Sequence, residues 1–239
     1  MSNLTIKICG LRNLETLDSA LDAGADMVGF VFFPPSPRHI DLALAQELGG
    51  RVAGRARKVA LSVDAADDVL AASIVALQPD LLQLHGKETP ERVAAVKARF
   101  QLPVMKAIAV ESVVDLACVP SYAAVVDHLL FDARAPRDAT RPGGLGRSFD
   151  WRILKNLDPD VPFMLSGGLN RDNVAEAVDI TGARGVDVSS GVEMAPGEKD
   201  ASLIRGFIQA VRAHTPTSSA SGVQKGGAGR SKPYERMKP

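Results

Sequence analysis

The stretch LTIKICGLRN, residues 4–13, carries the local pattern on which the fold prediction depends. Aliphatic residues occupy every second position from residue 4 to residue 8, while Lys7 and Cys9 fall on alternate positions. Side chains along a strand point in turn to its two faces. The stretch therefore predicts a strand with an apolar outer face and a thiol at its carboxyl end, and Gly10 is expected to leave that thiol room.

The same pattern recurs along the whole chain. Apolar runs start near residues 4, 27, 58, 80, 103, 127, 162 and 185. Helix-like segments separate most of these runs, as at 13–23, 90–100 and 171–181, with Thr89 and Asn170 as helix-start residues. Alternating strands and helices predict an α/β protein with a parallel sheet, and eight evenly spaced units favour a closed (β/α)8 TIM barrel over an open doubly wound sheet.

The composition is that of a globular protein without a polyanionic partner. Hydrophobic residues make up 46% of the 239 residues, and the 28 basic side chains are balanced by 28 acidic ones. No apolar run reaches the roughly 18 residues of a membrane span, and no secretory signal is visible. Cys9 and Cys118 are expected to be reduced. We expect a cytoplasmic protein with no nucleic-acid or membrane partner.

The chain divides into a body and a tail. Residues 214–239 hold little that could enter a core, and they carry five basic residues and one acid. This composition predicts a disordered basic tail after a single catalytic domain, the barrel of residues 1–213. A nucleic-acid role for the tail is the less favoured alternative.

Two loops of small residues follow the seventh and eighth predicted strands. They read LSGGLN at 165–170 and VSSGVE at 188–193. Active sites of (β/α)8 barrels lie at the carboxyl ends of the strands, and these two loops often form a phosphate site. Small residues let backbone N–H groups approach an anion closely. The presence of both loops favours a phosphate site over the alternative that these glycines only form tight turns.

Cys9 and Asp132 are the candidate base and acid. They end the first and sixth predicted strands, on different sides of the barrel mouth. General acid–base catalysis needs such a pair, and a thiol works better as a base when a nearby cation lowers its pKa from about 8.5, a role open to Lys7. Each residue alone has an ordinary alternative, core packing for Cys9 and a helix cap or ion pair for Asp132.

Other charged residues are placed at the same end of the barrel. Arg38 lies in a long Pro-rich loop and could pair with a substrate carboxylate, the alternative being a solvated arginine. His85 and Asp187 end the fourth and eighth predicted strands and should face the mouth. A metal site of Cys9, His85 and Asp187 is disfavoured because no short His/Cys spacing supports it. The glycine-rich segment 141–151 fits a lid over the sixth strand better than a nucleotide-binding loop.

Several blocks in order resemble the phosphoribosylanthranilate isomerase family of tryptophan biosynthesis. They are KICGLRN, DMVGFVFFPPSPRHI, LLQLHG, LLFDA, GGLGRSFDW, LSGGLN and GVDVSSGVE, and they extend from about Lys7 to Phe207. The resemblance implies a (β/α)8 barrel that needs no cofactor or metal. It also implies an aldose–ketose isomerase whose phosphosugar substrate, N-(5-phosphoribosyl)anthranilate, undergoes an Amadori rearrangement to 1-(2-carboxyphenylamino)-1-deoxyribulose 5-phosphate.

The resemblance also implies roles for individual residues. Cys9 matches the family's general base, Asp132 its general acid and Arg38 its anchor for the anthranilate carboxylate. The matches to its phosphate cradle are Gly167, Gly168, Ser189, Ser190 and Gly191. His85 and Asp187 match recurring substrate-binding positions at the mouth.

The sequence departs from the family pattern at two positions, and it leaves alternatives open. Leu145 stands where a threonine is usual and Asp64 where an asparagine is more usual. One alternative is an indoleglycerol-phosphate synthase, for which Lys106 would be the nearest lysine, and another is a non-catalytic sensor of phosphorylated ligands. A monomer is the expected state, with a homodimer as the alternative.

Overall fold

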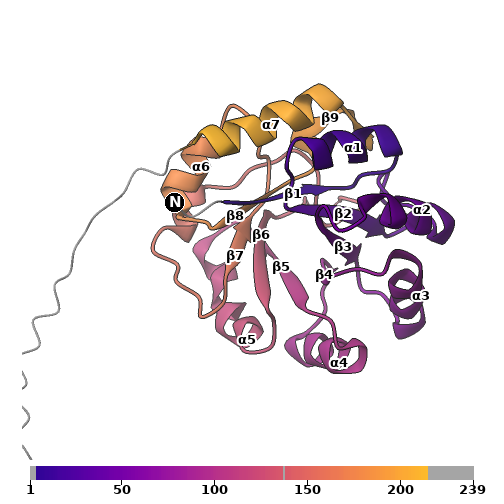
Figure 1. The fold of residues 1–239 in the computed structure, drawn as a ribbon. Helices are drawn as coiled ribbons and strands as arrows, with labels where there is room; N and C mark the ends of the chain where they lie inside the picture. The colour runs from indigo at the N-terminus through magenta and orange to yellow at the C-terminus, as the bar shows by residue number, and fades with distance from the viewer. Residues whose placement is uncertain (1–3, 137, 215–239) are drawn as a thin grey trace, which may run out of the picture.

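The computed structural model describes residues 4–136 and 138–214, and it shows a closed barrel of eight parallel strands (Figure 1). Neighbouring strands pair in chain order, and β1 pairs with β8 to close the ring. The strands are β1 Thr5–Cys9, β2 Met27–Phe32, β3 Arg57–Ser62, β4 Leu81–Leu84, β5 Val104–Val110, β6 His128–Ala133, β7 Phe163–Leu165 and β8 Gly185–Val188. The predicted (β/α)8 barrel is confirmed, and the open sheet is wrong.

Helices surround the strands (Figure 1). They are α1 Leu14–Asp22, α2 Leu42–Val52, α3 Asp67–Leu77, α4 Pro90–Phe100, α5 Val119–Ala123, α6 Val174–Thr181 and α7 Ala201–Ala213. Short 3-10 helices and one hairpin complete the chain: η1 Val113–Cys118, η2 Trp151–Leu154, η3 Ser190–Val192, β9 Glu193–Ala195 and β10 Glu198–Lys199. The last helix, α7, packs against both α1 and α6 and so joins the two ends of the barrel domain. None of the helices in the described part of the chain has the length and apolar character to span a membrane.

The two helix starts expected from the sequence differ in outcome. Thr89 precedes α4 as predicted, and its hydroxyl accepts the N–H of Arg92. The start at residue 171 is wrong, because α6 begins only at Val174. The side chain of Asn170 instead accepts the backbone N–H of Asp172, at 2.8 Å. Asn170 therefore caps a turn ahead of the helix.

In β1 the side chains alternate between the outer core and the barrel interior, as predicted from residues 4–13. Ile6 and Ile8 are fully buried in the main core under the helices. The barrel interior holds a separate lower layer, formed by Met27, Val59, Leu81, Met105, Ala107, Leu130 and Met164. Cys9 packs with Val31 and Leu61 in a layer nearer the carboxyl ends of the strands. The thiol is therefore placed at the mouth of the barrel.

Lys106 points away from the barrel interior. It lies in register with Leu84 and Leu129, which belong to the outer core. Its Nζ lies 2.9 Å from Glu88 Oε2 and donates to the carbonyl of Gly86 at 2.7 Å. Since this amine does not reach the mouth, it cannot supply the catalytic lysine of the synthase alternative.

Aspartates immediately before three even-numbered strands tie the amino-terminal end of the barrel together. Each carboxylate accepts a backbone N–H near the start of the preceding strand. The pairs are Asp26 with Ile6 at 2.7 Å, Asp80 with Lys58 at 2.7 Å and Asp127 with Val104 at 2.8 Å. These bonds satisfy N–H groups that have no neighbour in the sheet at that point.

Asp127→Ala is expected to lower the free energy of unfolding by about 1–2 kcal/mol, because the N–H of Val104 loses its acceptor. Although burial opposes ionisation, the N–H of Val104 and Lys97 hold the pKa of Asp127 below its usual value. Urea-induced unfolding measures the change. The exposed Asp172→Ala serves as the control, and an equal effect of the two substitutions would contradict this role.

Candidate active site

A cavity opens at the carboxyl ends of the strands. The predicted site residues that line it are Cys9, Arg38, His85, Asp132, Gly167, Gly168, Asp187, Ser189 and Ser190. Gly191 lies beside this lining, where a Cβ would meet the carbonyl oxygen of Leu169 at 1.9 Å. Residues from five strands or strand ends and from the long loop after β2 thus meet in one place, as expected for the mouth of a closed barrel.

The thiol of Cys9 lies above a buried ion pair. Lys7 Nζ donates to Asp187 Oδ1 at 2.7 Å, and Ser166 Oγ lies 3.2 Å from Asp187 Oδ2. Burial disfavours the charged amine, but Asp187 and Cys9 hold the pKa of Lys7 above its ordinary value. Asp187 therefore faces the cavity as predicted, while one of its oxygens is committed to Lys7.

The pKa of Cys9 is raised. Burial disfavours the thiolate more strongly than the positive charges of Lys7 and Lys199 favour it, and Asp187 disfavours it further. Lys7 favours the thiolate, as expected from the sequence, but burial outweighs this effect and the net pKa is above that of an ordinary thiol. Gly10 leaves room for Arg38, because a Cβ on Gly10 would lie 2.6 Å from Arg38 Cδ. Its role beside the thiol stays a prediction.

Asp132 belongs to a chain of three side chains. Its Oδ1 accepts the N–H of Ala133 at 2.9 Å, and its Oδ2 lies 3.2 Å from His85 Nε2. His85 Nδ1 lies 3.0 Å from Nε2 of Gln83, which is fully buried inside the barrel. Gln83 and His85 hold the Asp132 carboxyl in position. Gln83 precedes His85 by two positions and therefore shares its face of the strand, but strand alternation gives no sign of this contact.

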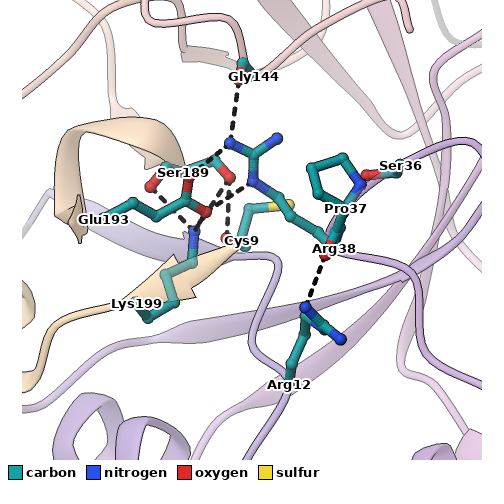
Figure 2. A network of polar contacts seen from close by, with 9 residues as sticks. All are labelled: Cys9, Arg12, Ser36, Pro37, Arg38, Gly144, Ser189, Glu193 and Lys199. Atoms are coloured by element: carbon teal, nitrogen blue, oxygen red, sulfur yellow. Dashed lines mark hydrogen bonds and ion pairs between the residues drawn. The ribbon is translucent and has the colours of Figure 1, made fainter. Parts of the chain in front are cut away.

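Arg38 is buried and held by a carboxylate (Figure 2). Its Nε donates to Glu193 Oε1 at 2.7 Å and its Nη2 to Glu193 Oε2 at 2.6 Å, a two-point pairing of the planar guanidinium. Nη2 also donates to the carbonyl of Gly144 at 3.0 Å. The alternative of a solvated loop arginine is therefore wrong.

Lys199, on strand β10, joins Arg38 to the end of β8. Its Nζ lies 2.6 Å from Glu193 Oε1 and donates to the carbonyl of Ser189 at 2.9 Å (Figure 2). The Ser189 hydroxyl in turn donates to the carbonyl of Cys9 at 3.1 Å. Burial lowers the pKa of Lys199 to about 8 despite the nearby carboxylate. Glu193 and Lys199 are site residues that the sequence did not reveal.

The segment predicted as a lid lies over the acid and the arginine. A Cβ on Gly143 would come within 2.5 Å of Asp132 Oδ2, and one on Gly144 within 2.5 Å of Arg38 Nη1. Glycines let this loop approach the site closely, and Arg141 and Leu145 line the cavity with them. The position over the mouth fits a lid, and its motion stays a prediction.

Comparison with known proteins gives the family. The family model described as N-(5'-phosphoribosyl)anthranilate (PRA) isomerase matches residues 6–210. The chain belongs to the phosphoribosylanthranilate isomerase family. It is 67% identical over 211 residues to the N-(5'-phosphoribosyl)anthranilate isomerase of Nitrobacter winogradskyi, covering 88% of this chain and 94% of that protein. It is 61% identical to the N-(5'-phosphoribosyl)anthranilate isomerase of Bradyrhizobium diazoefficiens, covering 93% of this chain and 100% of that protein.

Solved structures of the isomerase family share this fold. The phosphoribosylanthranilate isomerase of Thermotoga maritima superposes with a TM-score of 0.79 at 34% identity, over 87% of this chain and 98% of that one. A family member in complex with reduced 1-(o-carboxyphenylamino)-1-deoxyribulose 5-phosphate gives a TM-score of 0.76 at 33% identity, with the same coverage.

The departure from the isomerase pattern at Asp64 has a structural reason. Its backbone is left-handed, with φ at 47°, a conformation that aspartate and asparagine adopt more readily than other residues with a side chain. Oδ1 of Asp64 accepts the N–H of Lys87 at 2.6 Å. An asparagine oxygen could accept the same bond, so either residue suits this position. Nothing in the structure explains the leucine at position 145.

Proposed function

We propose that the chain converts N-(5'-phosphoribosyl)anthranilate to 1-(2-carboxyphenylamino)-1-deoxyribulose 5-phosphate, with Asp132 as general acid and Cys9 as general base. One observation carries the assignment of roles. A thiol and a carboxyl from β1 and β6 face one cavity that also contains a buried arginine and two loops of small residues. A substrate with a carboxylate at one end and a phosphate at the other can span such a cavity.

The reaction needs an acid that opens the ring and a base that acts at C2′. Asp132 gives a proton to the furanose ring oxygen, the bond from that oxygen to C1′ breaks, and the anthranilate nitrogen lone pair forms a protonated Schiff base. The thiolate of Cys9 then removes the proton from C2′, and the electron pair of that bond forms the C1′–C2′ double bond of an enolamine. In the tautomerisation to the ketone, C1′ gains a proton and the C2′ hydroxyl loses one, and the proton gained by Cys9 and the proton lost by Asp132 are thereby balanced. Only protons move and the formula is unchanged, so this chemistry requires no external oxidant or reductant.

The remaining residues hold the substrate and the catalytic groups. Arg38 receives the anthranilate carboxylate, while the backbone around 167–168 and 189–191 receives the phosphate. His85 and Asp187 border the sugar between these ends, each also bound to protein groups below it. Binding at both ends fixes the sugar between acid and base, which lowers the entropic barrier to reaction.

Turnover is tested directly with substrate formed in situ. Phosphoribosylanthranilate is generated in the cuvette, and its fluorescence is followed after addition of the purified full-length chain. We expect decay at a rate proportional to protein concentration. Decay at the spontaneous rate, with binding of the product analogue retained, would identify a non-catalytic sensor instead.

The rate at which iodoacetamide alkylates Cys9 is expected to rise with pH from about 6 to about 9. Alkylation needs the thiolate, and burial raises the pKa of Cys9 above that of an ordinary thiol. Below that pKa, each pH unit gives about ten times more thiolate, and the alkylation rate should follow it. The rate is measured in Cys118→Ala, which keeps Cys9 as its one cysteine, and a rate that is level over this range would contradict the raised pKa.

Assembly and location complete the proposal. We expect a cytoplasmic monomer whose catalytic unit is the barrel of residues 1–213, with a homodimer as the alternative. The Thermotoga maritima isomerase is described as dimeric, and monomers of it have been generated. The proposed tail from residue 214 onward lies, apart from His214, outside the described residues.

A further inference from the structure

Arg141 is a cation at the site without an anionic partner. It lies in the lid segment and lines the cavity. Its Nε is buried and has no hydrogen-bond partner, and within residues 4–136 and 138–214 its guanidinium forms no ion pair. The residue as a whole is half-buried, but a buried N–H without an acceptor is unfavourable, and an anionic oxygen could satisfy it.

The charges around Arg141 leave an excess of positive charge. Glu193 is the carboxylate of this cluster, and it already receives both Arg38 and Lys199. Burial and the proximity of Arg38 lower the pKa of Arg141, with Glu193 acting in the opposite direction. The cluster of three cations and one carboxylate therefore favours an additional anion.

The free donors of Arg38 face the same segment. Glu193 occupies its Nε and one N–H of Nη2, and Gly144 accepts from Nη2 as well. Nη1 makes no hydrogen bond to the described residues, and the lid backbone passes over it at Gly144. An anion that reaches Nη1 thus enters beside the loop that carries Arg141.

We propose that Arg141 is a specificity-determining residue that binds the aryl carboxylate of the substrate together with Arg38. The inference rests on the function proposed above and adds to it a second carboxylate contact, made from the lid. The substrate carboxylate then contacts two arginines: Arg38, in the loop after β2, and Arg141, in the loop after β6. Binding of the carboxylate thereby links substrate selection to the position of the lid.

Two substrates separate carboxylate recognition from other roles. Phosphoribosylanthranilate carries the carboxylate, and N-(5'-phosphoribosyl)aniline is the same molecule without it. Arg141→Gln should raise KM for the first substrate about tenfold or more, which is the usual effect of a lost charge-assisted hydrogen bond, and leave kcat nearly unchanged. With the aniline compound the same variant should differ from wild type less than about twofold, and Arg141→Lys should recover part of the loss.

The control is Arg152→Gln, which removes an exposed arginine just after the lid. It should match wild type on both substrates. Equal losses for Arg141→Gln on the two substrates would overturn the inference and assign Arg141 to lid structure, and so would unchanged kinetics on phosphoribosylanthranilate. Failure of the wild type itself to turn over phosphoribosylanthranilate would instead refute the proposed function, and the inference with it.

Discussion

Replacement of Cys9 by alanine should lower kcat on phosphoribosylanthranilate by about a thousandfold. The substitution removes the group that takes the C2′ proton, and general-base catalysis contributes about 10²–10⁴ in rate. Alanine fills less space than cysteine and leaves Lys7 and Asp187 paired below it. We therefore expect the reduced product analogue to bind nearly as tightly as to the wild type. Steady-state kinetics and isothermal titration measure the two quantities.

Cys118 offers a matched control for this experiment. It is the other cysteine of the chain, it is half-buried, and its thiol contacts the carbonyl of Asp115 away from the cavity. Cys118→Ala should keep wild-type kcat. Full activity in Cys9→Ala would rule out the thiol as base, and a similar loss in both variants would mean that the effect is not specific to the cavity.

Asp132→Asn is expected to lower kcat by about 10²–10⁴ as well, because an amide cannot donate the proton that opens the ring. The exchange preserves shape, and the asparagine oxygen can still accept the N–H of Ala133. The loss should therefore fall on kcat more than on KM. Kinetics with the in situ substrate measure this, together with the melting temperature as a check on folding.

The exposed Asp160→Asn controls for a general effect of removing one acid. It should be indistinguishable from wild type. An Asp132→Asn variant that kept more than about a tenth of wild-type kcat would transfer the acid role to another donor, with His85 the nearest candidate at 3.2 Å from the carboxyl.

The convergence of the site could be predicted from the sequence because a closed barrel brings strand ends together. Period-two alternation placed Ile6 and Ile8 outside and Cys9 inside, as the structure shows. Once eight parallel strands close, residues as distant as Cys9 and Asp132 must share one mouth. Neither step needs knowledge of side-chain contacts.

The contacts within the site could not be predicted in the same way. Arg38 and Glu193 are 155 residues apart, and no local pattern indicates that they pair. The raised pKa of Cys9 depends on how completely the thiol is buried, which is a property of packing rather than of neighbouring residues. The start of α6 was missed because the Asn170 side chain forms a local turn that competes with the helix.

A crystal structure of this protein with the reduced product analogue tests the mechanism most directly. The mechanism predicts Cys9 Sγ within about 3–4 Å of C2′, with the Asp132 carboxyl within hydrogen-bond distance of the oxygen that was in the furanose ring. The carboxylate should contact Arg38, and the phosphate should lie at 167–168 and 189–191. An analogue bound with its phosphate at Arg38, or with C2′ beyond reach of the Cys9 thiol, would contradict the assignment of base and acid.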